Sequence, residues 1–379
     1  LTAKSGKTDE YGNEMMTNID NKVEQITGEL LIDAPSNKSG LENYPQYPVF
    51  TSRENSFIYF DEETIQDGVY DRNAFYFELF PFSIDSLDNF TRDALKLEGT
   101  FVSAGILPPL ELEMTLRPDN SLGFYLQTPE KGLPVFNGKG VFYEDLEMSS
   151  KGLHGYGSLD YLTSTTWSDD FLFHPDSVLT TSRRFLEREQ DSPVSFPFVE
   201  NSVADVRWYP PEDVMNIRRI EKTFNIFNDS IHFGGDLALT PAGLRGTGPL
   251  ALKDARIESS DFKFLAQEIL ADSAGVMLKA SSEEEFAWIT NDVRIHIQLK
   301  ERKGEFQANQ DYTTVSFPQN MYETRLDHMT WYMGNQEIEM QQKKILPENR
   351  VDIGIDTVDT NGPTFLSLHP QQDSLKFVA

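Results

Sequence analysis

The sequence predicts a mainly β fold of repeated multi-strand modules, arranged as a β-sandwich, β-jellyroll or β-solenoid with few short helices. Three observations support this fold class: short apolar runs recur between turn residues, one segment of the chain is repeated, and few stretches have helical spacing. With 39% hydrophobic and 12% aromatic residues, the chain can bury cores and is too apolar for a disordered acidic tail.

Strands are predicted where apolar and polar residues alternate. The clearest is 110–116 (LELEMTL), in which four apolar side chains would line one face of a sheet. The alternation recurs at 293–300. Shorter runs at 29–32, 56–60 and 75–80 are bounded by Asp, Pro, Asn or Gly residues that favour turns.

Two segments are ambiguous between helix and strand. Residues 213–227 place four apolar side chains near helical spacing, but two prolines precede the segment and a polar run ends it. A strand-and-turn interpretation therefore stays open there, and the same ambiguity applies to 270–277.

An internal repeat is the most informative feature of the sequence. Residues 152–159 (GLHGYGSL) recur 91 positions later as 243–250 (GLRGTGPL). A period near ninety residues is too long for one solenoid rung or helical hairpin and indicates a module of several strands. Identical residues continue at the same offset of 91 positions on both sides of this segment. The pairs are Phe142 and Phe233, Leu146 and Leu237, Ser168 and Ser259, Asp170 and Asp261, Phe171 and Phe262, and Phe173 and Phe264.

The repeat sets the expected domain organisation. We expect a polar connecting segment over 1–24, an N-terminal β module over 25–130, β repeats over 131–225 and 226–340, and the start of a further β segment over 341–379. The sequence begins without an initiator Met or an apolar signal region and ends in strand-like residues. We therefore expect it to be a piece of a longer chain.

Composition excludes several classes of function. The 61 Asp+Glu against 33 Lys+Arg give a formal charge of −28, which disfavours binding to nucleic acid or to acidic membrane surfaces. With no cysteine, disulfides, thiolate metal sites and cysteine nucleophiles are excluded. The sequence has no run of about 18 uncharged apolar residues that would predict a membrane span.

The sequence contains no catalytic or cofactor-binding motif, so we predict no catalytic, cofactor-binding or metal-binding residue. Gly155 and Gly157 interrupt a strand pattern, as at a bulge or sheet corner, and do not form G-x-G-x-x-G. The segment 138–140 (GKG) lacks the hydroxyl residue of a P-loop, and six histidines are scattered singly. A polysaccharide-acting enzyme with a carboxylate pair stays open, because such a pair is recognised only by its separation in space.

Two further alternatives concern calcium and the aromatic residues. No cofactor is predicted, but a structural calcium ion is one interpretation of Asp352, Asp356, Asp359, Asn361 and Gly362, which equally suit ordinary turns. For the aromatic residues, core packing is the default, and an exposed row lining a sugar or lipid groove is the alternative. These residues are Phe171, Phe173, Phe262 and Phe264, together with Trp167, Trp208, Trp288 and Trp331.

Several stretches resemble the interior of very large secreted or cell-envelope proteins of Bacteroidota. This resemblance implies no activity that could be assigned to particular residues of this chain. The stretches are 44–50 (YPQYPVF), 85–90 (DSLDNF), 99–109 (GTFVSAGILPP), 317–322 (FPQNMY) and 331–333 (WYM), and the resemblance covers most of residues 23–340. It implies an exported, strand-rich segment of a longer chain.

A second, weaker resemblance is one of pattern. Residues 248–257 (GPLALKDARI) look like the β-jellyroll or β-taco modules of lipopolysaccharide-transport proteins. This resemblance implies modules that stack end to end and expose an apolar trough to lipid chains.

The first resemblance also implies sites of modification. Exported proteins of Bacteroidota carry O-glycans at Asp-Ser or Asp-Thr followed by a small or aliphatic residue, and composition alone gives roughly two such triplets. Asp-Ser pairs are also common in turns, so the alternative interpretation is that these triplets form ordinary turns. The six candidate acceptors are Ser86, Ser177, Ser230, Ser273, Thr357 and Ser374.

We therefore expect a non-enzymatic structural or conduit segment of a large exported cell-envelope protein built from β repeats. The alternatives are a carbohydrate- or lipid-binding β module and, third, the polysaccharide-acting enzyme. Expected partners are further modules of the same longer chain or other envelope proteins, with lipid or glycan as candidate ligands and no nucleic acid. The expected location is the periplasm, the outer membrane or the cell surface.

Overall fold

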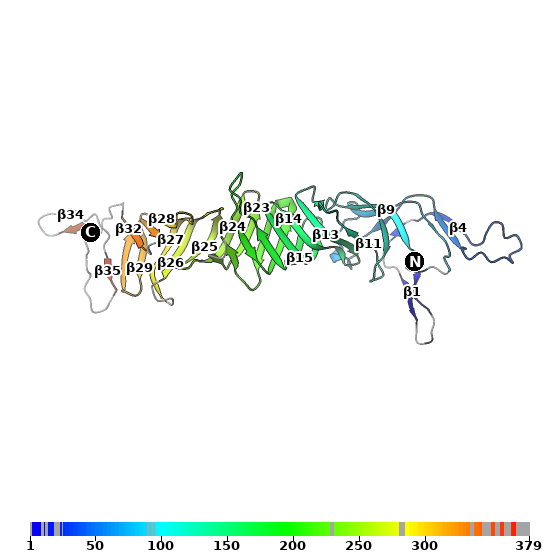
Figure 1. Cartoon of the computed structure of the whole chain (residues 1–379), viewed down its shortest axis with the longest axis horizontal. Helices are drawn as coiled ribbons and strands as arrows, with labels where there is room; N and C mark the ends of the chain where they lie inside the picture. The colour runs from blue at the N-terminus through cyan, green and yellow to red at the C-terminus, as the bar shows by residue number, and fades with distance from the viewer. Residues whose placement is uncertain are drawn as a thin grey trace. The chain divides into compact units, whose positions relative to one another are not determined.

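Antiparallel strands dominate the computed structural model (Figure 1). Strands make up 60% of the chain and helical turns 2%, so the prediction of a mainly β fold with few helices is confirmed. Short helical turns include η1 (Gln66–Gly68) and η3 (Pro210–Glu212). The structure describes residues 2–8, 11, 14–18, 23–24, 26–88, 91, 93, 95–227, 231–279, 285–333, 337–342, 350–352, 357–359 and 365–368.

The chain divides into two compact units. Unit 1 comprises Leu1–Leu162, Trp167–Thr181 and Tyr209–Pro211, and unit 2 comprises Thr163–Thr166, Ser182–Trp208 and Glu212–Ala379.

Unit 1 holds the strands of the N-terminal half, in which neighbours along the chain pair in an antiparallel manner. A separate small sheet has the order β4-β5-β8. The strands are β1 (Thr2–Thr8), β2 (Glu14–Asn18), β3 (Val23–Glu24), β4 (Gly28–Leu31), β5 (Val49–Ser52), β6 (Ser56–Tyr59), β7 (Phe75–Leu79), β8 (Ser83–Ile84), β9 (Lys96–Ser103), β10 (Leu110–Leu116), β11 (Leu122–Gln127), β12 (Leu133–Val135), β13 (Gly140–Ser149), β14 (Gly152–Tyr161), most of β15 (Ser164–Phe173) and β16 (Val178–Ser182).

Unit 2 continues the antiparallel pattern, and β24 to β28 pair in succession (Figure 1). Its strands are β17 (Arg184–Glu187), β18 (Val199–Asn201), most of β19 (Ala204–Tyr209), β20 (Val214–Arg219), β21 (Phe224–Ile226), β22 (Ile231–Phe233), β23 (Asp236–Thr240), β24 (Gly243–Ala251), β25 (Ala255–Phe264), β26 (Glu268–Lys279), β27 (Phe286–Gln298), β28 (Lys303–Ala308), β29 (Thr313–Phe317), β30 (Tyr322–Leu326), β31 (His328–Tyr332), β32 (Glu337–Gln341), β33 (Arg350–Asp352), β34 (Thr357–Asp359) and β35 (Phe365–Ser367).

The predicted strands are all present. Residues 110–116 coincide with β10, the run at 293–300 belongs to β27, and the three shorter runs correspond to β4, β6 and β7. The two ambiguous segments are strands as well, because 213–227 forms β20 and β21 and 270–277 lies within β26. In β20 the buried residues Met215 and Ile217 are two positions apart, which is strand periodicity.

An aromatic core runs through the first half of unit 1. The ring centroids of Phe60 and Phe75 lie 5.9 Å apart, those of Phe75 and Phe101 5.2 Å, and those of Phe101 and Phe124 4.9 Å. All three pairs meet edge to face, which is the favourable arrangement of aromatic quadrupoles. Side chains from β7, β9 and β11 therefore form one continuous core.

The repeat found in the sequence is also a repeat of strands. The first copy (122–173) lies in unit 1 apart from residues 163–166, and the second copy (213–264) lies in unit 2. Strands β12, β14 and β15 begin 91 positions before β21, β24 and β25, and β13 corresponds to β22 and β23 together.

The pairing register repeats too. Leu146 of β13 faces Leu126 on one side and Gly155 on the other. Its counterpart, Leu237 of β23, faces Ile217 and Gly246, the residues equivalent to Leu126 and Gly155. The two copies therefore have the same backbone pairing at equivalent residues.

Each copy is built around three phenylalanines. Phe142 contacts Phe171 and Phe173 edge to face, at centroid distances of 5.4 Å and 5.3 Å. Phe233 contacts Phe262 and Phe264 in the same way, at 6.0 Å and 5.3 Å. All six side chains are fully buried, so the prediction that these phenylalanines form the core is confirmed.

Glycine is required where the strands cross this cluster. A Cβ atom at Gly155 would lie 2.5 Å from Phe142 Cζ and 2.9 Å from Phe173 Cε2. At Gly246 the corresponding distances are 2.8 Å to Phe233 Cζ and 2.7 Å to Phe264 Cε2. Both glycines give the phenylalanine rings room, as expected for glycines that interrupt a strand.

Candidate functional site

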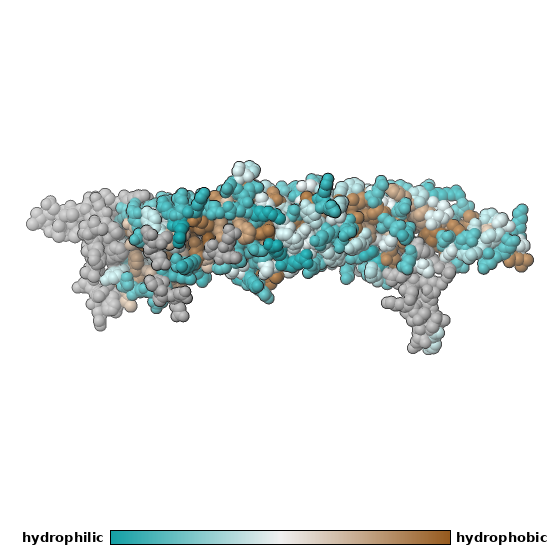
Figure 2. All heavy atoms as spheres, in the orientation of Figure 1, coloured by the Kyte–Doolittle hydropathy of each residue, from teal (hydrophilic) through white to brown (hydrophobic). Residues whose placement is uncertain are grey.

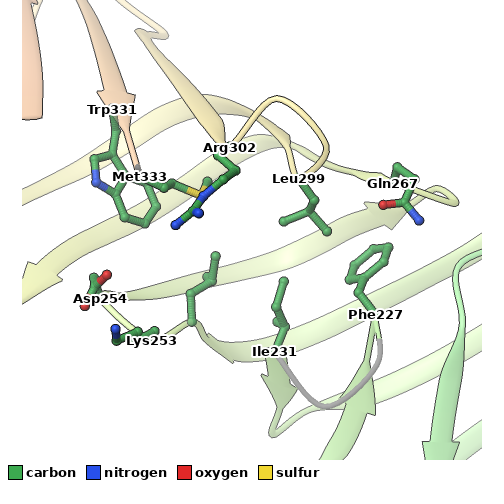
Figure 3. A pocket seen from close by; sticks show the side chains of 10 residues that line it. Phe227, Ile231, Lys253, Asp254, Gln267, Leu299, Arg302, Trp331 and Met333 are labelled. Atoms are coloured by element: carbon green, nitrogen blue, oxygen red, sulfur yellow. The ribbon is translucent and has the colours of Figure 1, made fainter. Parts of the chain in front are cut away.

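A pocket in the described part of unit 2 has a volume of about 450 Å³. This volume lies within the range of small-molecule sites. Turns and strand ends build the pocket, and Figure 3 shows side chains on opposite sides of the space. It is lined by Phe227, Ile231, Leu252, Lys253, Asp254, Gln267, Leu299, Arg302, Trp331 and Met333.

The wall of the pocket is largely apolar. Phe227 follows β21, Ile231 begins β22, Leu252 follows β24, and Trp331 belongs to β31. These four side chains are buried, which fixes their positions by packing. In Figure 2, apolar residues gather over β25 to β27, with polar residues around them.

Main-chain hydrogen bonds hold the turns of the pocket in place. The N–H of Leu299 donates to the carbonyl of Gln267 at 3.0 Å, and that of Arg302 donates to the carbonyl of Leu299 at 3.1 Å. The N–H of Met333 in turn donates to the Arg302 carbonyl at 3.0 Å. Arg302 has a left-handed φ of 54°, which closes the tight turn between β27 and β28.

Two cations and one carboxylate line the pocket. The exposed side chains of Lys253 and Arg302 bring positive charge to a protein whose net charge is −28, and Asp254 is half-buried beside them. The Gln267 amide donates to the carboxylate of Glu189 at 2.9 Å. An apolar space with cations suits a molecule with an apolar body and an anionic end.

A buried carboxyl group lies elsewhere in unit 2. Glu187 at the end of β17 is fully buried, and neither of its oxygens makes a hydrogen bond of normal geometry with a described residue, although Thr163 and the backbone of Arg188 lie close by. Burial raises the pKa of Glu187 to about 8, and Thr163 and Arg188 offset this only in part. The carboxyl group is therefore mostly protonated at neutral pH.

The predicted acceptor residues Ser86, Ser177 and Ser273, whose side chains the structure describes, lie on different segments of the chain. The Ser86 hydroxyl donates to the carbonyl of Pro45 at 2.9 Å, and Ser177 is buried and donates to Asp176 Oδ1 at 2.8 Å. Ser273 is exposed on β26 and donates to Asp292 Oδ1 at 3.0 Å. Outside the described residues lie Ser230 and Ser374, and Thr357 belongs to β34, whose side chains are not described.

Two histidines form separate polar contacts with carboxylates. His154 Nδ1 lies 2.6 Å from Asp170 Oδ1, and His296 Nε2 lies 2.8 Å from Glu268 Oε2. Among the side chains that the structure describes, no group of three or more His, Asp and Glu residues is placed to hold a metal ion. The candidate calcium ligands between Asp352 and Gly362 lie outside the described side chains.

The tryptophans belong mostly to the interior. Trp208, Trp288 and Trp331 are buried, and Trp167 is half-buried. In the described part of the chain, no helix has the length and apolar character needed to cross a bilayer.

Sequence reasoning missed the pocket and Glu187. The pocket residues are spread from 227 to 333 and mostly occupy turns, so no local pattern groups them. Glu187 occupies an inward position of a strand, and the alternation Phe185–Glu187 is the one signal that could have indicated its burial.

Comparison with known proteins gave no relative: no protein-family model matches the chain, and no curated protein does so either.

Proposed function

We propose that the chain is a non-enzymatic structural or conduit segment of a large exported cell-envelope protein built from β repeats. The observation that carries this proposal is the repetition of strands, register and aromatic core between the first and second copies. Modules that repeat in sequence and in register are typical of proteins built from successive similar units, which suits a scaffold. Its partners would be further modules of the same chain or other envelope proteins.

Surface charge supports the same proposal. Strand edges invite uncontrolled pairing, and charged outward positions prevent it. On β10, Glu111 and Glu113 point outward while Met114 is buried, and the chain as a whole carries −28. Such a surface keeps a repetitive β protein soluble while specific partners pair with its edges.

Mechanical unfolding tests the structural role. A load-bearing repeat protein pulled from its two ends should unfold in discrete steps, each releasing roughly 300 Å for a module of about 90 residues. Cell fractionation with an antibody against this segment tests the location, and recovery in envelope fractions is expected. Smooth extension without steps would contradict the scaffold, and recovery in the cytosol would contradict export.

A second candidate function is the binding of an anionic amphiphile, and the pocket in unit 2 favours it. Four buried apolar side chains, Phe227, Ile231, Leu252 and Trp331, form the wall, and Lys253 and Arg302 supply positive charge. Burial of an alkyl chain contributes about 0.8 kcal/mol per methylene, and the cations favour a carboxylate or phosphate head.

Titration with matched detergents tests this candidate. Dodecanoate should quench or shift tryptophan fluorescence with saturation, whereas dodecyltrimethylammonium, which has the opposite charge, should bind at least tenfold more weakly. The variant Lys253→Gln/Arg302→Gln should remove this preference, and Lys263→Gln, an exposed cation outside the pocket, should leave it unchanged. Equal binding of both detergents would contradict a cationic amphiphile site.

A further inference from the structure

The two copies share their core but differ on the outer face of the sheet. Outer positions of the first copy hold Tyr125 on β11, Glu147 on β13 and Tyr156 on β14. The equivalent positions of the second copy hold Asn216, Ala238 and Thr247 at the same register.

These three residues of the first copy belong to a polar network with an aromatic component. Arg117 donates from Nε and Nη2 to Glu147 Oε1, at 3.0 Å and 2.7 Å. The Tyr156 hydroxyl donates to the other oxygen of Glu147 at 3.2 Å. The guanidinium carbon of Arg117 lies 5.9 Å from the centre of the Tyr125 ring. The carboxylate of Asp145 lies near the Tyr125 hydroxyl and raises the pKa of that hydroxyl.

Exposure and rigidity suit this network to binding. Tyr125 is 55% exposed, one of the larger apolar surfaces on the described residues, whereas Arg117 and Glu147 are mostly covered. The Arg117–Glu147 pair therefore holds the surroundings of the tyrosine in one arrangement. A rigid aromatic ring flanked by fixed hydrogen-bonding groups binds ligands at a low cost in conformational entropy.

The fold does not need the network. The second copy has neither tyrosine nor the glutamate, yet Asn216 pairs with Ala238 and Asp236 with Thr247 as their counterparts do in the first copy. The phenylalanine cluster beneath the sheet is also unchanged. A feature present in one copy and dispensable for folding in the other points to a role outside folding.

The chemistry of this face selects one class of ligand. Tyrosine rings stack on the C–H faces of pyranose rings, and carboxylate and guanidinium groups bond sugar hydroxyls as acceptors and donors. Asp145, Glu147 and Asp170 outnumber Arg117 on this face, so a polyanion would be repelled. We infer that the outer face of unit 1 formed by Arg117, Tyr125, Asp145, Glu147 and Tyr156 binds a neutral polysaccharide chain. This binding would hold whether or not the chain acts as a scaffold.

Affinity electrophoresis in native gels tests the inference with the full chain. The gels contain a soluble neutral glucan, galactomannan or arabinoxylan, and polygalacturonate serves as the polyanion. At least one neutral polysaccharide should retard the protein, and polygalacturonate should not. The variant Tyr125→Asn/Tyr156→Thr replaces the two tyrosines with the residues found at the equivalent positions of the second copy and keeps the Arg117–Glu147 pair. It should weaken retardation at least tenfold.

Two controls separate lost binding from lost folding. The variant Asn216→Ala/Thr247→Ala changes the matched positions of the second copy and should bind as the wild type does. The single variant Tyr125→Ser alters an exposed side chain and should unfold at the same temperature as the wild type. Weaker retardation of this variant would then result from the lost tyrosine ring and not from unfolding. Absence of retardation by every neutral polysaccharide would overturn the inference, as would full retardation of the double variant or retardation by polygalacturonate alone.

Discussion

The buried carboxyl group of Glu187 should make the stability of the protein depend on pH in a way that one substitution removes. Glu187 is fully buried on β17, and neither of its oxygens makes a hydrogen bond of normal geometry with a described residue. Its charged form is therefore disfavoured in the folded state and hydrated in the unfolded state. The variant Glu187→Gln keeps the shape of the side chain and cannot ionise.

The magnitude follows from the shift in pKa. Burial raises the pKa of Glu187 from 4.5 to about 8, and each unit corresponds to about 1.4 kcal/mol. Because the folded state has the raised pKa, the contribution of Glu187 to stability is fully present below pH 4.5 and is lost as pH rises through 8. The wild type should thus lose about 3 kcal/mol relative to Glu187→Gln by pH 7, and about 5 kcal/mol by pH 9.

Urea unfolding of both proteins at pH 5, 7 and 9 measures this difference. Subtracting the two free energies of unfolding cancels the response of every other titrating group, and Glu111→Gln, an exposed glutamate on β10, serves as a control. The difference for Glu187→Gln should be small at pH 5 and grow steadily toward pH 9. A difference that stays constant from pH 5 to pH 9 would show that Glu187 is not held neutral in the folded protein.

Two glycines, a tyrosine and a phenylalanine provide further tests. Gly155→Ala or Gly246→Ala should lower the free energy of unfolding by about 1–3 kcal/mol, because the added methyl group overpacks the phenylalanine cluster. Adding Phe142→Leu should partly restore the stability of Gly155→Ala. A glycine variant as stable as the wild type would contradict the close approach of the rings. Tyr70→Phe should lower the free energy of unfolding by about 1–3 kcal/mol, because the buried hydroxyl bonds two backbone groups at 2.8 Å and 3.0 Å; an unchanged urea midpoint would refute this. Phe233→Ala should lower the free energy of unfolding by about 3–5 kcal/mol, because Phe233 is fully buried. A loss below 1 kcal/mol would show that the phenylalanine cluster of the second copy is loosely packed.

Local periodicity was sufficient to predict some of the strands, among them β10 and β27. In β10 and β27 the alternation of apolar and polar residues is a property of each segment itself, so it can be read without knowledge of the partners. The segment 213–227 was ambiguous because its apolar residues also fit a helical face, and pairing of β20 with β23 decides the matter in favour of a strand.

The pocket and the polar network could not be predicted in this way. Leu252, Leu299 and Trp331 meet only after β24, β27 and β31 have taken their places, so their proximity depends on the whole of unit 2. Arg117, which directly follows β10, and Glu147 of β13 are thirty positions apart in the sequence and form a hydrogen-bonded pair. Such contacts are set by strand order and register, which a single sequence does not encode locally.

Comparison of the two copies separates what the module requires from what it tolerates. On the outer face, His154 pairs with Asp170 in the first copy, and Arg245 pairs with Asp261 in the second. Either side chain can pair with the aspartate at this cross-strand position, so the position does not require one particular residue. The phenylalanines beneath it do not vary at all, because a close-packed core accepts few changes of shape. Tyr125 has no such constraint, and its replacement by Asn216 in the second copy is consistent with a ligand-binding role confined to the first.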